Sequence, residues 1–555
     1  SLVVDGTTVE LGTDSDISGK LTAASNLSDL TNAATARTNL GLGAAATMTP
    51  ATIAADAALT GTYAAGLTVP APTGVSATDS AAVQAAHDAL PATGGTLTLQ
   101  RGDYDLTAGV TFTKPTTLVG QGMGGFTAAA PTRVLCTSAT AVPITIASEG
   151  SGLRDLAIVN TAATPTAGAG VAVTSGDNLR VTRVKVLGFY VGVTVTQGRY
   201  QCFTNCSFFD SVHYGLYLRN TTAGQFDFGD ISVMGCTFAS LTTSRIADIA
   251  CRWESGGGLR FVNNKTNGNY NTLGQSQTVG LSAAVADGSS TSVLLVEGNS
   301  FEGIVNGGAP VVVTQSGTGT GSFSKVIVTG NEALFGAGIR VIGLGSSGLI
   351  ENVLIANNVL TSNDPGVYVK NANRVTVGRN QVTGMASTTG AAVWIDTGVT
   401  DYTVEPQDID GSTNVQLLRD DSATATATKM TGNVGTYRRG LPAIASAVTY
   451  VNLLQAQFNA YTGAVIEFEM YGQVAGLGGF AWSAKRVVAQ GAAGTTPVLS
   501  TVGTDVSSAN TPDVQIDGSA NQTVTLKARL GGSGTAVYGI ATLKVNGVVS
   551  RVWKL

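Results

Sequence analysis

The sequence predicts an all-β chain whose longest part is a β-solenoid, and two observations support this prediction. Similar segments recur along the middle of the chain, and a second series of alternating strands is interleaved with them at the same period. The composition agrees, because glycine accounts for 71 of 555 residues and only 12 % of residues are charged. Small and β-branched residues suit stacked strands joined by tight turns.

The first series consists of segments such as LRVTRVKV, LLVEGNSF and VIVTGNEA, which follow one another at about 28 residues on average. Aligned positions in this series are Val184, Cys206, Cys236, Lys265, Asn299, Asn331, Asn358 and Asn380. Asparagine tolerates left-handed backbone and can stack its amide on the next amide. We therefore expect a ladder of asparagines where successive coils bend.

The second series contains the segments GVAVTSG, VGVTVTQG, YGLYLRN, PVVVTQSG, AGIRVIG, PGVYVKN and AAVWIDTG, which alternate with period two. A coil cannot bury its inner face alone, so the core exists only as a stack whose ends must be covered. A capping helix is predicted at 79–90, where Val83, Ala86 and Leu90 share one helical face before a Gly-Gly pair ends the helix.

The region before the solenoid contains NLSDLTNAATARTNLGLG, from Asn26 to Gly43. It has four leucines and no aromatic residue, too little apolar surface for an independent core. Ser28 is placed to cap a short helix that Gly41 ends. Because such a helix is marginal alone, we expect its leucines to pack against copies of themselves in neighbouring chains.

The repeat fades towards the C-terminus. A Thr-, Ala- and Gly-rich stretch without periodicity predicts a linker, and the strand pairs after it, broken by GGSGT and NG, predict a separate antiparallel β-sandwich. The expected domains are a trimerisation region at 1–70, the solenoid at 71–410, the linker at 411–440 and the sandwich at 441–555.

Charge and hydropathy exclude two classes of partner. The net charge is −5 and no block of Lys or Arg occurs, so nucleic acid is not an expected partner. No run of about 18 apolar residues is present, so membrane insertion is not expected. The residues from Ser1 onward carry no charged-then-apolar leader, so no signal peptide is expected.

The cysteines predict neither a disulfide framework nor a metal site. Five is an odd number in a long chain, which favours free thiols. Cys202 and Cys206 have the spacing of half a metal site, but His87 and His213 are the only histidines that can complete it. Buried small apolar cysteines are the preferred interpretation, and no metal or cofactor is expected.

Two segments carry a resemblance to a known family. The run from Ala77 to Gly122, ATDSAAVQAAHDALPATGGTLTLQRGDYDLTAGVTFTKPTTLVGQG, resembles the opening of the pectate-lyase-like superfamily, with a capping helix, Gly-Gly, a strand, a GxY turn and a closing LVGQG. The NLSDLTNAATARTNLGLG segment resembles one found in bacteriophage tail fibres and tailspikes. Together they resemble a phage tailspike or branched tail fibre with a right-handed parallel β-helix.

This resemblance implies a function and a location. It implies a homotrimer in the virion tail, assembled in the host cytoplasm and attached to a phage baseplate or adaptor protein through the N-terminal region. It further implies binding of a host surface polysaccharide, and often cleavage by hydrolysis or β-elimination. We expect an endo-glycosidase, with a polysaccharide lyase and a non-catalytic glycan-binding adhesin as the alternatives; the fold does not decide among them.

The residues from 210 to 260 have the chemistry that such a function needs. Hydrolysis of a glycosidic bond uses two carboxylates, and sugars are bound by aromatic faces and by bidentate polar groups. Acids, cations and aromatic side chains are mixed here as in no other part of the repeat. The expected catalytic residues are Asp227, Asp230, Asp248 and Glu254. The expected substrate-binding residues are Arg219, Arg252, Trp253, His213, Tyr214 and Tyr217.

Several of these residues have a structural alternative. Asp227 and Asp230 can be turn residues or one side of a calcium site. Glu254 beside Arg252 can form a surface ion pair that contributes little. Trp253 suits a subunit interface as well as a sugar ring.

The remaining candidate residues also have structural alternatives. His213 precedes a strand and can be a structural turn residue. Tyr214 and Tyr217 are three residues apart, so in a regular strand they face opposite ways and at most one lies in the groove. Glu302 and Glu332 form the runner-up site, because they follow the asparagines of their coils and are expected on the same edge; the same spacing suits a solvated ridge.

Overall fold

The computed structural model describes two strands before residue 66, at 2–4 and 7–9, and most of the chain from residue 66 onward. From residue 66 onward it does not describe 125–129, 220–229, 241–247, 255–256, 268–276, 303, 316, 335–337, 345–349, 362–364, 385–390, 406, 411–414, 422–432, 441–450, 458–462, 476–477, 490–495, 502–505, 508–512, 520–522, 530–534, 548–550 and 555.

Residues 1–65 and 66–555 are two separate units. In the first, β1 (Leu2–Val4) and β2 (Thr7–Val9) pair antiparallel. The helix predicted between Ser28 and Gly41 lies outside the described residues.

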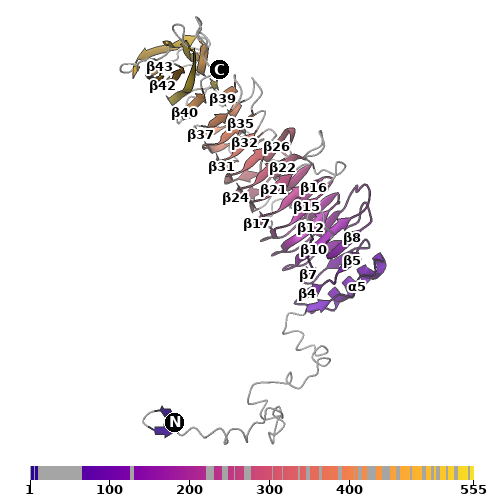
Figure 1. Ribbon diagram of the computed structural model, residues 1–555. Coiled ribbons are helices and arrows are strands. Elements are labelled where there is room, and N and C mark those ends of the chain that lie inside the picture. The colour runs from indigo at the N-terminus through magenta and orange to yellow at the C-terminus, as the bar shows by residue number, and fades with distance from the viewer. Residues whose placement is uncertain are drawn as a thin grey trace, which may run out of the picture. The chain divides into compact units, whose positions relative to one another are not determined.

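The predicted solenoid is confirmed as a parallel β-helix (Figure 1). One of its sheets has 16 strands, and the twelve contributed by the solenoid pair parallel to their neighbours, one strand per coil. These strands are β6 (Val110–Phe112), β9 (Ile144–Ile146), β11 (Ala169–Val173), β13 (Val191–Val195), β16 (Tyr214–Arg219), β19 (Ile249–Glu254), β22 (Gln277–Val285), β26 (Ile304–Gln315), β30 (Ile339–Ile342), β33 (Val367–Lys370), β36 (Ala391–Ile395) and β39 (Val415–Asp420).

The other sheet, here called the bent sheet, has two limbs, and β10 (Gly152–Asn160) and β12 (Arg180–Leu187) run through both. The first limb adds β3 (Gly66–Thr68), β4 (Gly95–Thr98), β7 (Thr116–Val119), β14 (Cys202–Thr204), β17 (Ile231–Met234), β20 (Gly258–Val262), β24 (Val293–Glu297), β28 (Val326–Thr329), β31 (Glu351–Ala356), β34 (Asn373–Val377) and β37 (Thr400–Val404). The second limb adds β5 (Gly102–Asp105), β8 (Thr132–Cys136), β15 (Ser207–Phe209), β18 (Thr237–Ala239), β21 (Lys265–Asn267), β25 (Ser300–Glu302), β29 (Glu332–Leu334), β32 (Val359–Thr361), β35 (Gln381–Thr383) and β38 (Asp408–Asp410).

An amide ladder runs along the corner between the two limbs, as predicted. Each side-chain amide donates to the amide oxygen of the next coil, at 2.8 Å from Asn299 to Asn331 and 2.9 Å from Asn331 to Asn358. The ladder begins at Asn264 and ends at Gln407. The alignment is wrong by one residue at Lys265, because Asn264 occupies the ladder position and Lys265 pairs with Thr237 on the outer face.

The predicted cap is present as α5 (Ser76–Asp88), which starts three residues earlier than expected. Its buried face includes Val83 and His87, whereas Ala86 is only half-buried. Asp79 explains the earlier start, because its carboxylate accepts hydrogen bonds from the backbone of Thr73, Gly74 and Asp105 and so ties the first turn to the first coil. No helix among the described residues is long and apolar enough to cross a membrane.

The parallel ladder continues to residue 420, beyond the expected end at 410, because β39 still pairs with β36. Within 411–440, where the sequence predicts a linker, Asn433–Gly440 is a strand, β40. Antiparallel strands that extend the 16-stranded sheet beyond β39 are β41 (Val451–Gln457), β46 (Asp513–Ser519), β47 (Thr523–Arg529) and β49 (Arg551–Lys554). Strands of a further antiparallel sheet with β40 are β42 (Gly463–Ala475), β43 (Gly478–Ala489), β44 (Val498–Thr501), β45 (Val506–Ser507) and β48 (Thr535–Gly547).

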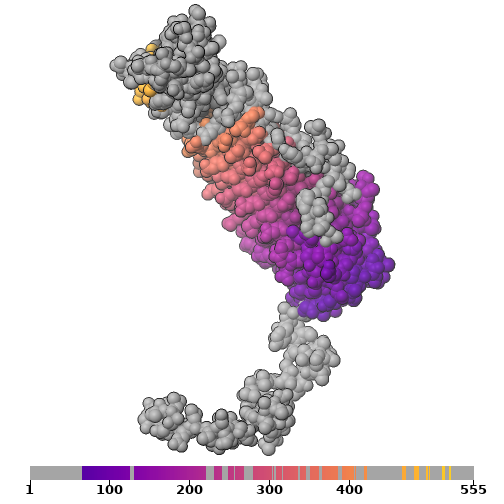
Figure 2. All heavy atoms as spheres, in the orientation of Figure 1, coloured from indigo at the N-terminus to yellow at the C-terminus, as the bar shows by residue number. Residues whose placement is uncertain are grey.

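The C-terminal strands are therefore antiparallel, as predicted, and one sheet of them is continuous with the solenoid through the pairing of β49 with β39. A small pair, β23 (Ser290–Thr291) and β27 (Ser322–Phe323), joins two adjacent coils. Figure 2 shows the described coils in successive colours along the solenoid. Ile, Val, Leu and Phe side chains form its buried interior.

Candidate functional site

The predicted site lies on the outer face of the 16-stranded sheet, on β16 and β19. In the register of these two strands, Tyr217 is opposite Arg252 and Arg219 is opposite Glu254. Alternation along β19 turns Arg252 and Glu254 outward and the residue between them inward. The strands thus bring four of the predicted residues together on one patch.

Tyr217, Arg252 and Glu254 form a hydrogen-bonded cluster. The Tyr217 hydroxyl donates to one Glu254 carboxylate oxygen at 2.7 Å, and Arg252 Nε donates to the other at 2.6 Å. Arg252 also donates to Ser282 Oγ at 3.2 Å. The Arg219 guanidinium lies 5.4 Å from the Tyr217 ring centre, within cation–π range. Both members of the ion pair keep about a quarter of their side-chain surface exposed, 25 % and 27 %.

A row of rings continues from this cluster towards the start of β16. The Tyr217 and Tyr214 ring centres are 4.7 Å apart, those of Tyr214 and His213 are 3.8 Å apart, and Tyr190 stacks on His213 at 5.4 Å. His213 Nδ1 is 2.8 Å from an Asp248 carboxylate oxygen. Since a carboxylate on one imidazole nitrogen orients the ring, Asp248 orients His213, whose role as a site residue stays a prediction.

The expectation that Tyr214 and Tyr217 face opposite ways is wrong. Gly215 and Leu216 are both buried, so the inward-outward alternation of β16 slips by one residue between the two tyrosines. A side chain at Gly215 would collide with the carbonyl of Ala250 on the next coil, at 2.6 Å, so the strand needs glycine here. Both tyrosines consequently lie on the outer face.

The interpretation of Trp253 as a surface for a sugar ring is also wrong. Its relative exposure is 0 %, and it lies in the register between Leu218 and Ala283, which are both buried. Its ring centre is 6.1 Å from that of Phe323 across the interior. The physical reason is the strand period, since the outward positions on β19 are taken by Arg252 and Glu254.

Burial and nearby charges both shift the pKa values of Tyr214 and Tyr217. Burial, followed by the hydrogen bond to the Glu254 carboxylate and its negative charge, raises the pKa of Tyr217 to about 12. Burial is also the largest cause that raises the pKa of Tyr214. Both hydroxyls therefore remain protonated donors at neutral pH.

The other two predicted acids lie between β16 and β17 in the sequence. Asp227 lies outside the described residues. Asp230 directly precedes β17 and has a left-handed backbone, with φ of 55°. Its carboxylate oxygen lies 3.2 Å from the place that a Cβ on Gly258 would occupy. Asp230 therefore lies beside the start of β20, the strand that follows Glu254 on the next coil.

The runner-up pair lies on a different face, the second limb of the bent sheet. Glu302 ends β25 and Glu332 begins β29, and the two strands are neighbours, as expected. Glu302 forms an ion pair with Lys265 at 3.1 Å, and Glu332 is exposed. No aromatic ring belongs to this pair among the described residues, so a solvated ridge is the better interpretation.

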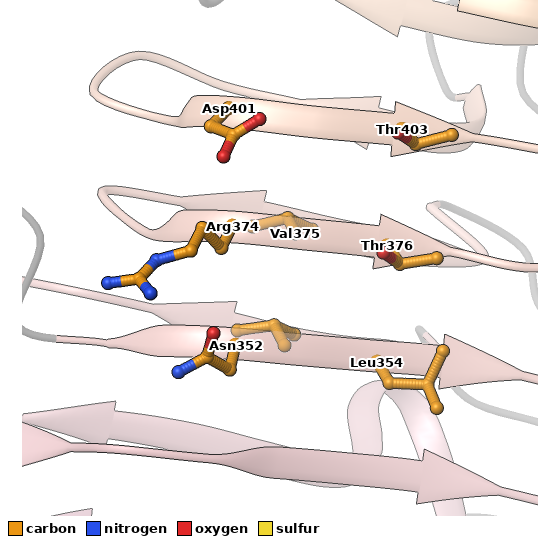
Figure 3. Close-up of a pocket in the computed structure, with 8 residues that line it drawn as sticks. Asn352, Leu354, Arg374, Val375, Thr376, Asp401 and Thr403 are labelled. Carbon is orange, nitrogen blue, oxygen red and sulfur yellow. The ribbon is translucent and has the colours of Figure 1, made fainter.

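A groove of about 340 Å³ lies on the first limb of the bent sheet, across β31, β34 and β37 (Figure 3). Asn352, Arg374 and Asp401 form one wall, one above the other on successive strands, and all three have left-handed backbone. Arg374 is engaged with Glu351 at 3.0 Å. This groove is on another sheet than the predicted site and contains none of the predicted residues.

Sequence reasoning missed a second aromatic and charged cluster on the 16-stranded sheet. Tyr368 donates to Asp396, its ring meets Trp394 edge-on at 5.1 Å, and the Arg419 guanidinium stacks over Trp394 at 3.8 Å. Lys370 is 3.8 Å from Asp396. The signal was present, because Tyr217, Tyr368 and Trp394 occupy equivalent places in YGLYLRN, PGVYVKN and AAVWIDTG.

All five cysteines are free thiols, and four of them are buried. Cys206 and Cys236 occupy ladder positions and bond backbone carbonyls. Among the described residues, no group of three or more His, Cys, Asp or Glu side chains is arranged to hold a metal ion.

Comparison with known proteins gives similarity at the level of solved structures alone. No family model matches the chain, and no curated protein matches it. The chain is similar to a mutant tailspike protein of E. coli bacteriophage HK620 in complex with a hexasaccharide, at 14 % identity and a TM-score of 0.45, covering 85 % of this chain and 90 % of that one.

Two further structures are similar at low identity. One is the Dettilon tailspike protein, at 10 % identity and a TM-score of 0.40, covering 84 % of this chain and 91 % of that one. The other is a tailspike of Acinetobacter baumannii bacteriophage Fri1, described as a capsular polysaccharide depolymerase, at 13 % identity and a TM-score of 0.33, covering 86 % and 84 %.

Proposed function

We propose that this chain is a phage tailspike that binds a host surface polysaccharide and cleaves it within the chain. The observation that carries the proposal is the Tyr217–Glu254–Arg252 cluster at the end of a row of half-buried rings on the outer face. Aromatic faces, a guanidinium fork and a fixed carboxylate are the groups that recognise sugar rings and their hydroxyls. The family resemblance of the two N-terminal segments supports the same class of protein.

The proposed chemistry is hydrolysis of a glycosidic bond. A carboxylic acid donates a proton to the leaving oxygen, and a carboxylate either takes a proton from the attacking water or attacks the anomeric carbon before water does. We assign the carboxylate role to Glu254, because Arg252 and Tyr217 hold both of its oxygens. Water ends as the hydroxyl of one product and the hydrogen of the other.

The proton donor in this proposal is Asp230 or Asp227. Asp248 is six residues from Glu254 on an extended strand, a backbone separation of about 20 Å, whereas paired carboxylates of glycosidases lie roughly 5 to 9.5 Å apart. Asp230 directly precedes β17, beside the start of β20, the strand that follows Glu254 after the corner, and we therefore choose it over Asp248. Asp248 and His213 then bind substrate hydroxyls at the far end of the ring row.

A non-catalytic adhesin is the second candidate, and one observation favours it. The two acids placed on the outer face of β19 and its approach, Asp248 and Glu254, have too wide a backbone separation for a hydrolytic pair. Such a surface binds a glycan through rings and hydrogen bonds without cleaving it. The trimer, the virion-tail location and attachment to a baseplate or adaptor protein belong to either candidate.

The test uses the purified full chain on lawns of bacterial strains and then on surface polysaccharide from a strain that forms a halo. New reducing ends indicate hydrolysis, and unsaturated ends indicate elimination. Glu254→Gln should lower the rate about 10²–10⁴-fold. Glu149→Gln, an exposed acid in the turn between β9 and β10, is the matched control. Binding without cleavage by the wild type would establish the adhesin instead.

A further inference from the structure

The outer face of the 16-stranded sheet carries one continuous row of side chains between the two clusters. Cross-strand partners along this row, called the outer row below, are Tyr217, Arg252, Ser282, Val312, Arg340, Tyr368, Trp394 and Arg419. Five strand spacings separate Tyr217 from Tyr368, or about 24 Å at 4.8 Å each. The row follows the stacking direction of the coils.

The two ends of this stretch are built alike. At one end, the Tyr217 hydroxyl donates to Glu254 on the next strand; at the other, the Tyr368 hydroxyl donates to Asp396 on the next strand. Each tyrosine is accompanied by another ring, Tyr214 and Trp394 respectively. Sequence-distant coils thus present the same pairing of an aromatic face with a hydrogen-bonded carboxylate.

The middle of the stretch consists of short side chains and one charged residue, Arg340. Ser282, Val312 and the neighbouring Thr314 have short side chains, of which Ser282 is buried and the other two are half-buried. Arg340 follows, half-buried on β30. Arg252 is neutralised by Glu254 of the same strand at 2.5 Å, and Arg419 by Asp421, directly after β39, at 2.6 Å. Arg340 forms no ion pair with any residue that the structure describes.

The backbone of this face offers nothing to an added strand, because each strand of the row is already paired on both sides. A ligand must therefore be recognised through side chains. Rings at both ends suit sugar faces, and an unpaired guanidinium is complementary to a carboxylate, which it can bind through two parallel hydrogen bonds.

We propose that the outer row between Tyr217 and Tyr368 binds an acidic polysaccharide along the stacking direction, with a carboxylate-bearing sugar on Arg340. The proposal rests on the proposed function and specifies its substrate class. The Tyr217 end holds the bond to be cleaved, and the Tyr368–Trp394 end anchors the same chain several sugars away. Arg340 is a specificity-determining residue remote from the reacting atoms.

The test measures binding by calorimetry in a Glu254→Gln background, so that cleavage does not interfere. The probes are the polysaccharide of a halo-forming strain and the same polymer after carbodiimide activation and borohydride reduction of its carboxyl groups to alcohols. Arg340→Gln should weaken binding of the native polymer about 10-fold or more, since a charge-assisted hydrogen bond is lost. Arg340→Lys should bind more tightly than Arg340→Gln but less tightly than the Glu254→Gln parent. Arg260→Gln, which changes an exposed arginine of the bent sheet, should bind as tightly as that parent.

Carboxyl reduction of the polymer should weaken its binding to the Glu254→Gln protein by a similar factor. It should not change the affinity of the protein that also carries Arg340→Gln, because the reduction and the substitution remove the same contact. Equal affinity of Arg340→Gln for the native polymer overturns the proposal, as does binding that is insensitive to carboxyl reduction. A lower oligomer mass of Arg340→Gln would assign this face to contact between copies of the chain. If the wild type binds no polysaccharide, the proposed function fails first, and this inference falls with it.

Discussion

Tyr217 and Glu254 lie on neighbouring strands of the 16-stranded sheet, with 2.7 Å between the tyrosine hydroxyl and the carboxylate oxygen that accepts its hydrogen. This bond ties the aromatic row to the ion pair of Glu254 with Arg252. Because both residues are fixed by strand register rather than by a loop, the carboxylate has one orientation towards the outer face.

The first prediction concerns this bond. Tyr217→Phe keeps the ring and removes the donor, so the rate of reducing-end release should fall about 10- to 100-fold, the worth of one hydrogen bond to a charged group. Tyr200→Phe, which changes an exposed tyrosine, should have no effect. Full activity of Tyr217→Phe would show that Glu254 does not need this donor.

The pH dependence of that effect follows from the raised pKa. Burial and the Glu254 carboxylate raise the pKa of Tyr217 to about 12, so the hydroxyl stays protonated throughout the working range. The ratio of wild-type to Tyr217→Phe rates should therefore be constant from about pH 6 to 9. A ratio that changes in that range would indicate that Tyr217 titrates, and would favour its action as the base of an elimination.

The solenoid was predictable because its signals are local and repeated. Each coil carries the same alternation and the same bend, so an error in one segment, such as the one-residue shift at Lys265, does not alter the fold. The end of the repeat was less predictable, since β39 pairs with β36 although its sequence lacks the motif. Pairing there depends on backbone register, which composition does not reveal.

The site was predictable as a neighbourhood but not residue by residue. Strict alternation in IACRWE places Trp253 opposite to Arg252 and Glu254, whereas the chemistry of the ring alone favours the outer face. The slip at Gly215 could not be read from one segment, because it depends on the carbonyl of Ala250 in the next coil. Contacts between coils therefore decide the details that periodicity leaves open.

The second prediction separates a core role of Trp253 from a binding role. Trp253→Ala should lower the free energy of unfolding by about 3–5 kcal/mol, because a fully buried ring leaves a cavity beside Phe323. Trp253→Phe should lower the free energy of unfolding by less than Trp253→Ala does. Denaturant unfolding followed by circular dichroism measures both. Wild-type stability combined with lost glycan binding would restore the surface interpretation.

The third prediction concerns the amide ladder. Asn331→Leu or Asn358→Leu leaves the amides of neighbouring coils unpaired, at a cost of about 1–3 kcal/mol per group. Gln381→Leu is the matched control, because that amide is exposed on the strand next to the ladder. Melting temperatures unchanged in both ladder variants would refute a stabilising role.

The fourth prediction concerns His87 under the cap. Burial lowers the pKa of His87, and its ring nitrogens contact Thr116 and Thr113 at 3.0 Å and 3.3 Å. A lowered pKa in the folded state means that the unfolded chain binds protons more readily, so stability is full above about pH 6.5 and falls as the pH drops further.

Thermal unfolding between pH 8 and 5 tests this coupling. His87→Gln should lower the melting temperature at pH 8 and flatten its decline towards pH 5, since the titrating group is gone. An equal slope in wild type and variant would mean that His87 is not the group responsible.

The fifth prediction concerns assembly. We expect a parallel homotrimer, since the leucines of the Asn26–Gly43 segment need partners and a long solenoid leaves lateral faces to cover. Light scattering of the full chain at micromolar concentration should give three times the 56.0 kDa chain mass. Leu30→Ser with Leu40→Ser should lower that mass, whereas Leu344→Ser, an exposed leucine of the solenoid, should not. A monomer mass for the wild-type chain would contradict the trimer, and an unchanged trimer in the double variant would move the association to the solenoid or the C-terminal sheets.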